Sequence, residues 1–189
     1  MAASAKKSEQ VRDNILESAQ RLFNRHGFSA VSIDDVMGEA GLTRGSFYRY
    51  FSSKTELYAQ SVIRAVGEKR ARAARVGQHS GADQIVRDYL SEGHQNNIET
   101  GCPMIALPAD ISRMDPSVRA AFESALRLMI EMFQHELRES GQARDHAIAI
   151  SALCVGGMVL ARSVEDRDLA AELRAASMNV ALSLGNWRN

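Results

Sequence analysis

The sequence contains little proline, cysteine or aromatic residue. Its 189 residues include 3 Pro, 2 Cys and 1 Trp, and aromatic residues make up 6%. With so few prolines, long stretches can form uninterrupted helices. The two cysteines, Cys102 and Cys154, lie far apart, so the sequence predicts neither a disulfide framework nor a zinc site. We expect an all-α protein with enough residues for one large domain or two small ones.

Long hydrophobic runs are also missing. The first ten residues, MAASAKKSEQ, are polar, so no signal peptide is expected. The longest apolar stretch, residues 147–161, is shorter than the roughly 20 residues that cross a bilayer. These absences predict a cytoplasmic protein that has no membrane partner.

The sequence carries no net charge, which taken alone argues against a nucleic-acid-binding protein. The charges are unevenly distributed, however. Residues 1–75 contain 13 Lys and Arg against 8 Asp and Glu, and the remainder contains 10 against 15. A basic N-terminal part on an acidic body suits a DNA-binding head that is carried by a separate domain.

Residues 32–51, SIDDVMGEAGLTRGSFYRYF, have the pattern of a helix-turn-helix. Ser32 and Asp35 have capping-box spacing at the start of a short apolar-striped helix. Gly41 permits a left-handed helix stop, and Thr43 can cap a second helix over residues 44–51. The second helix of such a motif enters the major groove of DNA.

A helix over residues 8–26, ended by Gly27, would complete a three-helix head. Residues 1–7 are expected to form a loose, mildly basic arm. Phe47 and Phe51 are predicted to belong to the core of the head rather than to its DNA-binding surface.

The recognition segment resembles that of TetR-type repressors. The resemblance is carried by TRGSFYRYF at residues 43–51 and SKTEL at residues 53–57. It spans about residues 11–57, and beyond them it persists only in the helix layout. It implies a DNA-binding domain over residues 1–52 and a helical ligand-binding and dimerisation domain over residues 53–189. The function it implies is transcriptional regulation. A homodimer would bind a palindromic double-stranded operator and be released from it by a small-molecule effector.

The candidate DNA contacts fall within this motif. Arg44 is the best base reader, because a guanidinium pairs bidentately with guanine O6 and N7. Thr43 and Ser46 are short hydrogen-bonding residues, and Gly45 permits close approach of the backbone. The resemblance implies phosphate contacts by Ser32, Tyr48 and Lys54. It places Arg49 and Tyr50 at the two variable positions of the family's motif. The full predicted set is Ser32, Thr43, Arg44, Gly45, Ser46, Tyr48, Arg49, Tyr50 and Lys54.

The rest of the chain is predicted to form helices over residues 53–75, 82–97, 115–140, 147–161 and 168–184, with a short helix beginning at Pro103. The helix over 147–161 is apolar on nearly every side, and Gly156–Gly157 within it predicts close approach of another backbone. A monomer would struggle to cover both of the last two helices. We therefore expect a two-fold dimer in which they join a four-helix bundle.

The resemblance to TetR-type repressors implies an effector site between the helix at 53–75 and the helices that follow it. Tyr89, Met104, Met129, Met132 and Phe133 are candidates by composition, because methionine-rich linings suit adaptable apolar sites. Ordinary core packing is the alternative for each of them. His94 and His135 are expected to be surface or packed histidines.

Cys102 is a further candidate for the effector site. Gly101–Cys102 resembles the segment that bears the sensing cysteine in electrophile-responsive TetR-type members. A helix N-terminus there would favour the thiolate. The alternative is a small buried residue of the core, and Cys154 is expected to be structural.

No catalytic residue, cofactor or metal site is predicted. The leading hypothesis is a ligand-responsive transcriptional repressor. One alternative is a DNA-binding dimer of low sequence specificity. The other is a small enzyme that uses Cys102 with a histidine, but no glycine-flanked nucleophile, phosphate loop or metal-spaced cluster supports it.

Overall fold

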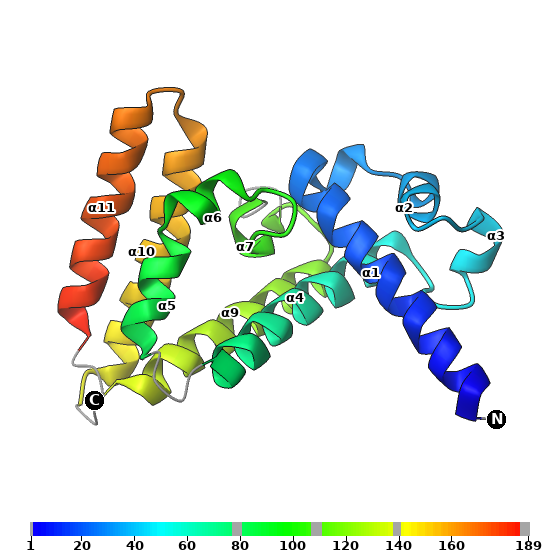
Figure 1. The fold of residues 1–189 in the computed structure, drawn as a ribbon, viewed down its shortest axis with the longest axis horizontal. Helices are drawn as coiled ribbons and strands as arrows, with labels where there is room; N and C mark the ends of the chain where they lie inside the picture. Colours follow the sequence, from blue (N-terminus) through cyan, green and yellow to red (C-terminus); the bar gives the residue numbers. More distant parts are fainter. Residues whose placement is uncertain (1, 77–80, 107–110, 138–140, 186–189) are drawn as a thin grey trace.

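The computed structural model describes residues 2–76, 81–106, 111–137 and 141–185, and the regular elements in these ranges are all α-helices (Figure 1). The all-α prediction is confirmed. The small helices α2 and α3 lie at one end of the molecule, and the α10–α11 hairpin lies at the other (Figure 1). Helices α4 and α9 occupy the middle, and α1 runs from the middle to the end that holds α2 and α3 (Figure 1).

The head is formed by α1 (Ala2–Ala30), α2 (Ile33–Glu39), α3 (Arg44–Phe47) and the first half of α4 (Lys54–Val76). The predicted loose arm is wrong, because α1 is already helical from Ala2, through a run of good helix formers. Gly27 interrupts α1 with φ 81° and ψ 164°, as expected for a glycine stop, before a last turn ends at Ala30.

The recognition helix is shorter than predicted. The α-helix ends at Phe47 instead of residue 51, and turns follow. Phe51 N–H still donates to Phe47 O at 3.1 Å, so a further turn is closed and both rings point into the core. Aromatic residues have modest helix propensity, and here their burial decides the backbone path.

One continuous core joins the head to the body. Phe23 of α1 packs edge-on against Tyr58 of α4, with ring centroids 5.3 Å apart. Phe47 and Phe51 are buried as predicted. On α4 itself, Ile63 is 43% exposed.

The body comprises α5 (Ala82–Tyr89), α6 (Glu92–Asn96), α7 (Pro103–Ala106), α9 (Pro116–Glu136), α10 (Ala143–Ser163) and α11 (Arg167–Leu184). The single helix predicted over residues 82–97 is wrong. Leu90 is buried between α5 and α6, and the Ser91 side chain starts a new helix by accepting from His94 N–H at 3.1 Å. Pro103 opens α7 as predicted.

Helix α10 is 21 residues long, six more than the apolar stretch seen in the sequence. Its mean hydropathy of 1.5 and its length would suffice for a membrane span. The expectation that this segment is too short to cross a bilayer therefore does not hold. One face of α10 is buried against neighbouring helices, as in the core helix of a folded domain. Its buried residues are Ala147, Ile150, Ser151, Cys154, Gly157, Met158 and Ala161.

The paired glycines of α10 have different surroundings. A Cβ at Gly157 would lie 2.7 Å from Ser177 Cβ of α11 and 3.3 Å from Leu90 Cδ2. The predicted close approach is therefore present at Gly157, made by side chains rather than by a backbone. A Cβ at Gly156 would meet nothing within 4 Å.

Candidate DNA interface and effector site

The start of α2 is held by a complete capping box. Ser32 Oγ accepts from Asp35 N–H at 3.1 Å, and Asp35 Oδ2 accepts from Ser32 N–H at 2.8 Å. The hydrogen bonds from Ser32 lower the pKa of Asp35, so this carboxylate remains ionised as a helix cap.

The turn between α2 and α3 is fixed by two backbone hydrogen bonds. Gly41 has φ 70°, which favours glycine. Leu42 N–H donates to Met37 O at 2.8 Å, and Gly41 N–H donates to Gly38 O at 3.0 Å. This is the Schellman pattern, and it sets the angle at which α3 leaves α2.

Arg44 lies at the surface at the start of α3 and is ion-paired with Asp34 of α2. The hydrogen bond to Asp34, with a smaller contribution from Tyr48, raises the pKa of Arg44. Tyr48 is 61% exposed and packs edge-on against the buried Phe47. The pair with Asp34 holds the candidate base reader in a defined position on the outer face.

The other predicted DNA contacts differ in exposure. Thr43, Gly45 and Arg49 are exposed, as is Ser32. The Thr43 side chain makes no capping hydrogen bond, so the predicted role of that hydroxyl at the helix start is not observed.

Three of the predicted contacts are half-buried. Ser46 Oγ donates to Thr43 O at 2.7 Å, and Tyr50 packs against the core. The ammonium of Lys54 lies 4.4 Å from the ring centroid of Phe28, and burial lowers its pKa. The ammonium of Lys54 is therefore held against the partly buried ring of Phe28.

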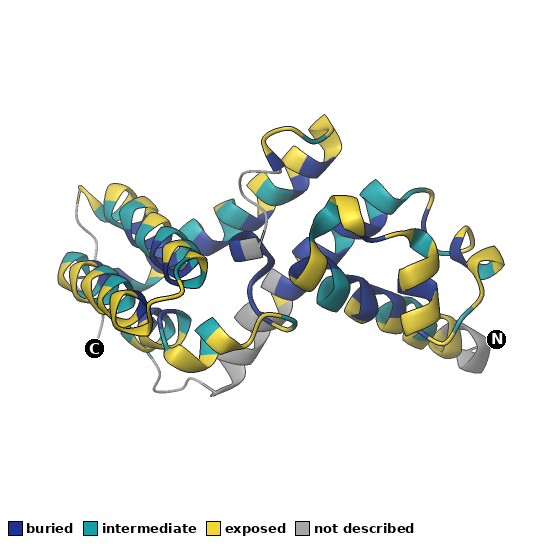
Figure 2. Ribbon diagram, turned by 90° about the horizontal axis from the view of Figure 1, so that it is seen from above, coloured by how far each residue is buried: buried dark blue, intermediate teal, exposed yellow. Residues whose placement is uncertain are grey.

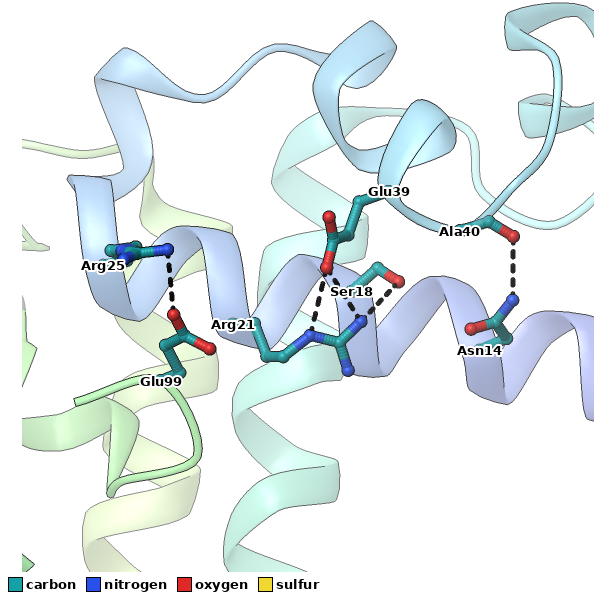
Figure 3. Close-up of polar contacts among 7 residues, drawn as sticks. All are labelled: Asn14, Ser18, Arg21, Arg25, Glu39, Ala40 and Glu99. Carbon is teal, nitrogen blue, oxygen red and sulfur yellow. Dashed lines mark hydrogen bonds and ion pairs between the residues drawn. The ribbon is translucent and has the colours of Figure 1, made fainter. Parts of the chain in front are cut away.

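Sequence reasoning missed the polar contacts that brace the motif against α1 (Figure 3). Asn14 Nδ2 donates to Ala40 O at 2.9 Å, and Arg21 pairs with Glu39 at 3.2 Å. These residues recur at helical spacing along α1, a signal that could have identified a polar face turned towards α2.

The candidate effector residues come from α5, α7 and α9 and from the chain just before α7. Cys102, Met104, Met129 and Phe133 are buried in the continuous core. Met132 and Tyr89 are partly buried against it. An apolar effector that contacts the four buried residues would have to displace side chains that pack around them.

The backbone at Cys102 is tied to His94. Cys102 N–H donates to His94 Nε2 at 3.2 Å, so the proton of the neutral ring lies on Nδ1, which contacts Tyr89 O at 2.6 Å. The His94 ring also packs edge-on against Tyr89 at 4.8 Å. The histidine is packed, as expected, and here it connects α5 to the start of α7. His135 is exposed.

The thiol of Cys102 is buried beside the phenol of Tyr89. The Tyr89 hydroxyl is buried, and among the described residues it has no hydrogen-bond partner. Burial, and then the neighbouring Cys102, raise the pKa of Tyr89 well above its ordinary value. Burial raises the pKa of Cys154 to about 12, so that thiol stays protonated. Because α7 is a single turn, the helix-terminus reason for a thiolate at Cys102 is weak.

Within the described ranges no three His, Cys, Asp or Glu side chains are grouped so that they could hold a metal ion.

Two family descriptions match the chain. Residues 15–60 match "Bacterial regulatory proteins, tetR family". Residues 79–177, more than half of the chain, match "Transcriptional regulator LmrA/YxaF-like, C-terminal domain".

Individual relatives are distant. The transcriptional regulator LmrA of Bacillus subtilis is 23% identical over 168 residues, covering 82% of this chain and 88% of that protein. An uncharacterized regulator of the same organism, YfiR, is 32% identical over 78 residues, but the match covers only 41% of this chain and 38% of YfiR.

The repressor NemR of Escherichia coli is 24% identical over 137 residues, 69% of this chain and 68% of NemR. The crystal structure of reduced NemR superposes with a TM-score of 0.73 at 22% identity, covering 90% of this chain and 96% of that one. At this identity the structural match shows the shared fold.

Proposed function

Because the chain belongs to the TetR family of bacterial regulatory proteins, we propose that it is a dimeric repressor that binds a palindromic operator and is released by a small effector. The observation that carries this proposal is the capped and Schellman-locked motif that presents Arg44 and Tyr48 outward. Two such heads on one dimer would read two half-sites in successive major grooves. The protein would act in the cytoplasm, and we assign it no catalytic role.

We divide the chain into a DNA-binding domain over residues 1–52 and a ligand-binding and dimerisation domain over residues 53–189. The nine residues predicted from the sequence remain the proposed DNA interface, with Arg44 as base reader and Tyr48 as phosphate contact. Asp34 joins them as the partner that positions Arg44.

The proposed dimer forms through α10 and α11, whose outward faces are exposed (Figure 2). Large apolar side chains lie on these faces, which is unusual for solvent-exposed helices of a monomer. They are Ile148, Leu160, Leu169 and Val180, each more than 40% exposed. Between them α10 presents Ala152 and Gly156, small residues that permit close approach of a partner helix.

Replacing Arg44 tests the DNA interface. Arg44→Ala is expected to lower operator affinity by about 1–3 kcal/mol, roughly 5- to 150-fold, because a bidentate base contact is lost. The affinity for random duplex should fall much less, so the ratio of operator affinity to random-duplex affinity should decrease. The measurement is fluorescence anisotropy at one fixed salt concentration, with an operator selected from a random duplex library.

Arg127→Ala is the matched control, since Arg127 is an exposed arginine paired with Glu123 in α9, outside the head. It should leave both affinities unchanged. If Arg44→Ala preserved the ratio of operator to random binding, Arg44 would not be the base reader. A wild-type protein that binds random DNA as tightly as any selected duplex would favour the low-specificity alternative.

We further propose that a thiol-reactive effector acts at Cys102. The side chain is 2% exposed within a close-packed core, so an adduct on its sulfur cannot be accommodated without moving α7. With N-ethylmaleimide as the probe, the sulfur adds to one carbon of the double bond, and the thiol proton ends on the neighbouring carbon.

Cys102→Ala should bind operator as the wild type does but resist release by N-ethylmaleimide. Labelled wild type is expected to lose about tenfold or more in operator affinity, within the usual range of coupling between sites. Cys154→Ala is the control, and it should retain release because the Cys154 thiol stays protonated. Unchanged release in Cys102→Ala would exclude Cys102 as the effector site.

A further inference from the structure

The chain between α6 and α7, residues 97–101, is held by α1 of the DNA-binding head. Asn24 Nδ2 donates to Glu99 O at 3.0 Å and to Gly101 O at 3.3 Å. Asn24 is only 8% exposed, and a buried amide of this kind is costly to leave unpaired. Gln20 Nε2 adds a longer contact to Gly101 O at 3.5 Å, and Arg25 pairs with the Glu99 carboxylate at 3.0 Å (Figure 3).

The same segment is held on its other side by Arg162 near the end of α10. The guanidinium donates through Nε to Gln95 O at 3.1 Å and through Nη2 to Asn97 O at 3.1 Å, and it also contacts His94 O. Gln95 Nε2 returns a hydrogen bond to Ala161 O at 3.2 Å. Since α10 forms part of the proposed dimer interface, Arg162 ties residues 97–101 to the part of the molecule that is shared by both subunits.

Residues 97–101 form a tightly folded turn that cannot absorb a displacement by changing its own shape. Gly101 N–H donates to Ile98 O at 3.3 Å, and Thr100 Oγ1 donates to Asn97 Oδ1 at 2.8 Å. A Cβ at Gly101 would lie 3.2 Å from Ile98 O and closer still to Asn97 O. The turn is therefore tightly folded, and a shift of the next residue, Cys102, must move the carbonyl of Gly101.

Helix α1 extends the connection to the helix-turn-helix. Three residues before Asn24, Arg21 of α1 pairs with Glu39 of α2 (Figure 3). A displacement of residues 97–101 thus reaches the motif through α1 and the Arg21–Glu39 pair. Packed elements of this kind transmit small shifts because they do not deform smoothly.

We propose that Asn24 is the positioning residue that couples Cys102 to the DNA-binding head, by holding the carbonyls of Glu99 and Gly101 against α1. In the unmodified protein these bonds keep the head in its DNA-binding orientation relative to α10. Displacement of Cys102 breaks them and releases the head. The inference rests on the proposed function, which supplies the event at Cys102, and it adds the route by which that event reaches DNA.

The first test compares Asn24→Ala with Asn14→Ala. Both variants remove an α1 asparagine that donates to backbone carbonyls, but Asn14 bonds only within the head. Each protein is labelled with N-ethylmaleimide until mass spectrometry shows one adduct at Cys102, and its operator affinity is measured before and after labelling. Labelled wild type and Asn14→Ala should lose about tenfold or more, whereas labelled Asn24→Ala should lose less than about threefold. Equal losses in all three proteins would overturn the coupling role.

A second measurement needs no effector. Because coupling between sites is reciprocal, operator binding should slow amide hydrogen exchange at Gly101 and Cys102 in the wild type and in Asn14→Ala, but not in Asn24→Ala. Equal slowing in Asn24→Ala, or none in the wild type, would overturn the inference. If labelled wild type keeps its operator affinity while exchange remains coupled to operator, the effector proposal fails and the coupling stands.

Arg162→Met provides an independent variant should Asn24→Ala fail to fold. It keeps an unbranched apolar stem but removes the donors to His94, Gln95 and Asn97, so Asn97 loses its hydrogen bond to α10 while the Gln95 bond to Ala161 O remains. The same loss of response to labelling is expected, and operator affinity before labelling should already be lower than in the wild type, because a contact that holds the head in its DNA-binding orientation is gone. Full release of labelled Arg162→Met would contradict the proposal.

Discussion

Gly156→Glu is expected to convert the protein into monomers and to weaken operator binding roughly 100-fold or more, because two linked heads gain that much from avidity. A Cβ at Gly156 meets nothing within 4 Å inside one subunit, so the subunit itself can accept the larger side chain. Glycine is also a poor helix former, so the isolated subunit should become no less stable. Analytical ultracentrifugation gives the mass, and anisotropy gives the operator affinity.

Gly67→Glu is the matched control for this variant. Gly67 lies within α4, outside α10 and α11, and a Cβ there would also meet nothing within 4 Å. It should leave the protein dimeric. A Gly156→Glu protein that remains dimeric would show that subunits associate through another surface.

Phe47→Ala is expected to destabilise the head by about 3–5 kcal/mol, the usual cost of removing a fully buried phenylalanine ring. Phe47 is 0% exposed and packs against Phe51 with ring centroids 5.8 Å apart. Helix α3 has only four residues, so no second turn can compensate for the loss. Urea unfolding followed by circular dichroism measures the effect, and operator binding should be lost with it.

Tyr48→Ala tests whether this cost comes from burial rather than from aromatic character. Tyr48 is the neighbouring residue and is 61% exposed, so its replacement should change stability by less than about 0.5 kcal/mol. Operator affinity should still fall, since a proposed phosphate contact is removed. Similar unfolding midpoints for Phe47→Ala and wild type would refute the assigned packing.

The helix-turn-helix could be predicted from the sequence because local rules determine it. Ser32 with Asp35 and the left-handed Gly41 were identified from spacing and residue type, and both have the predicted geometry. The break between α5 and α6 was missed because Leu90 continues the helical pattern. Only the packing of α5 against α10 and α11 makes a new cap at Ser91 favourable.

The contacts around Cys102 could not be predicted in the same way. Asn24 and Arg162 donate to backbone carbonyls, which every residue carries, so the sequence holds no sign of the acceptor. Methionine and aromatic residues, such as those proposed for the effector site, are typical both of a binding site and of a protein core. Composition alone therefore does not distinguish the two. Three of the proposed residues are buried in the core and two are partly buried, and effector binding there remains a prediction.

The ion pair between Asp34 and Arg44 also bears on how the protein would search a genome. A phosphate encountered at random must compete with Asp34 for the guanidinium, whereas a guanine edge offers two acceptors in return. An exposed pair of this kind is weak, so Asp34 lowers the affinity of Arg44 for an isolated phosphate only slightly. Because a very large number of non-cognate sites compete for each protein molecule, even a small reduction at each site shortens the time spent there and leaves more protein available for the operator.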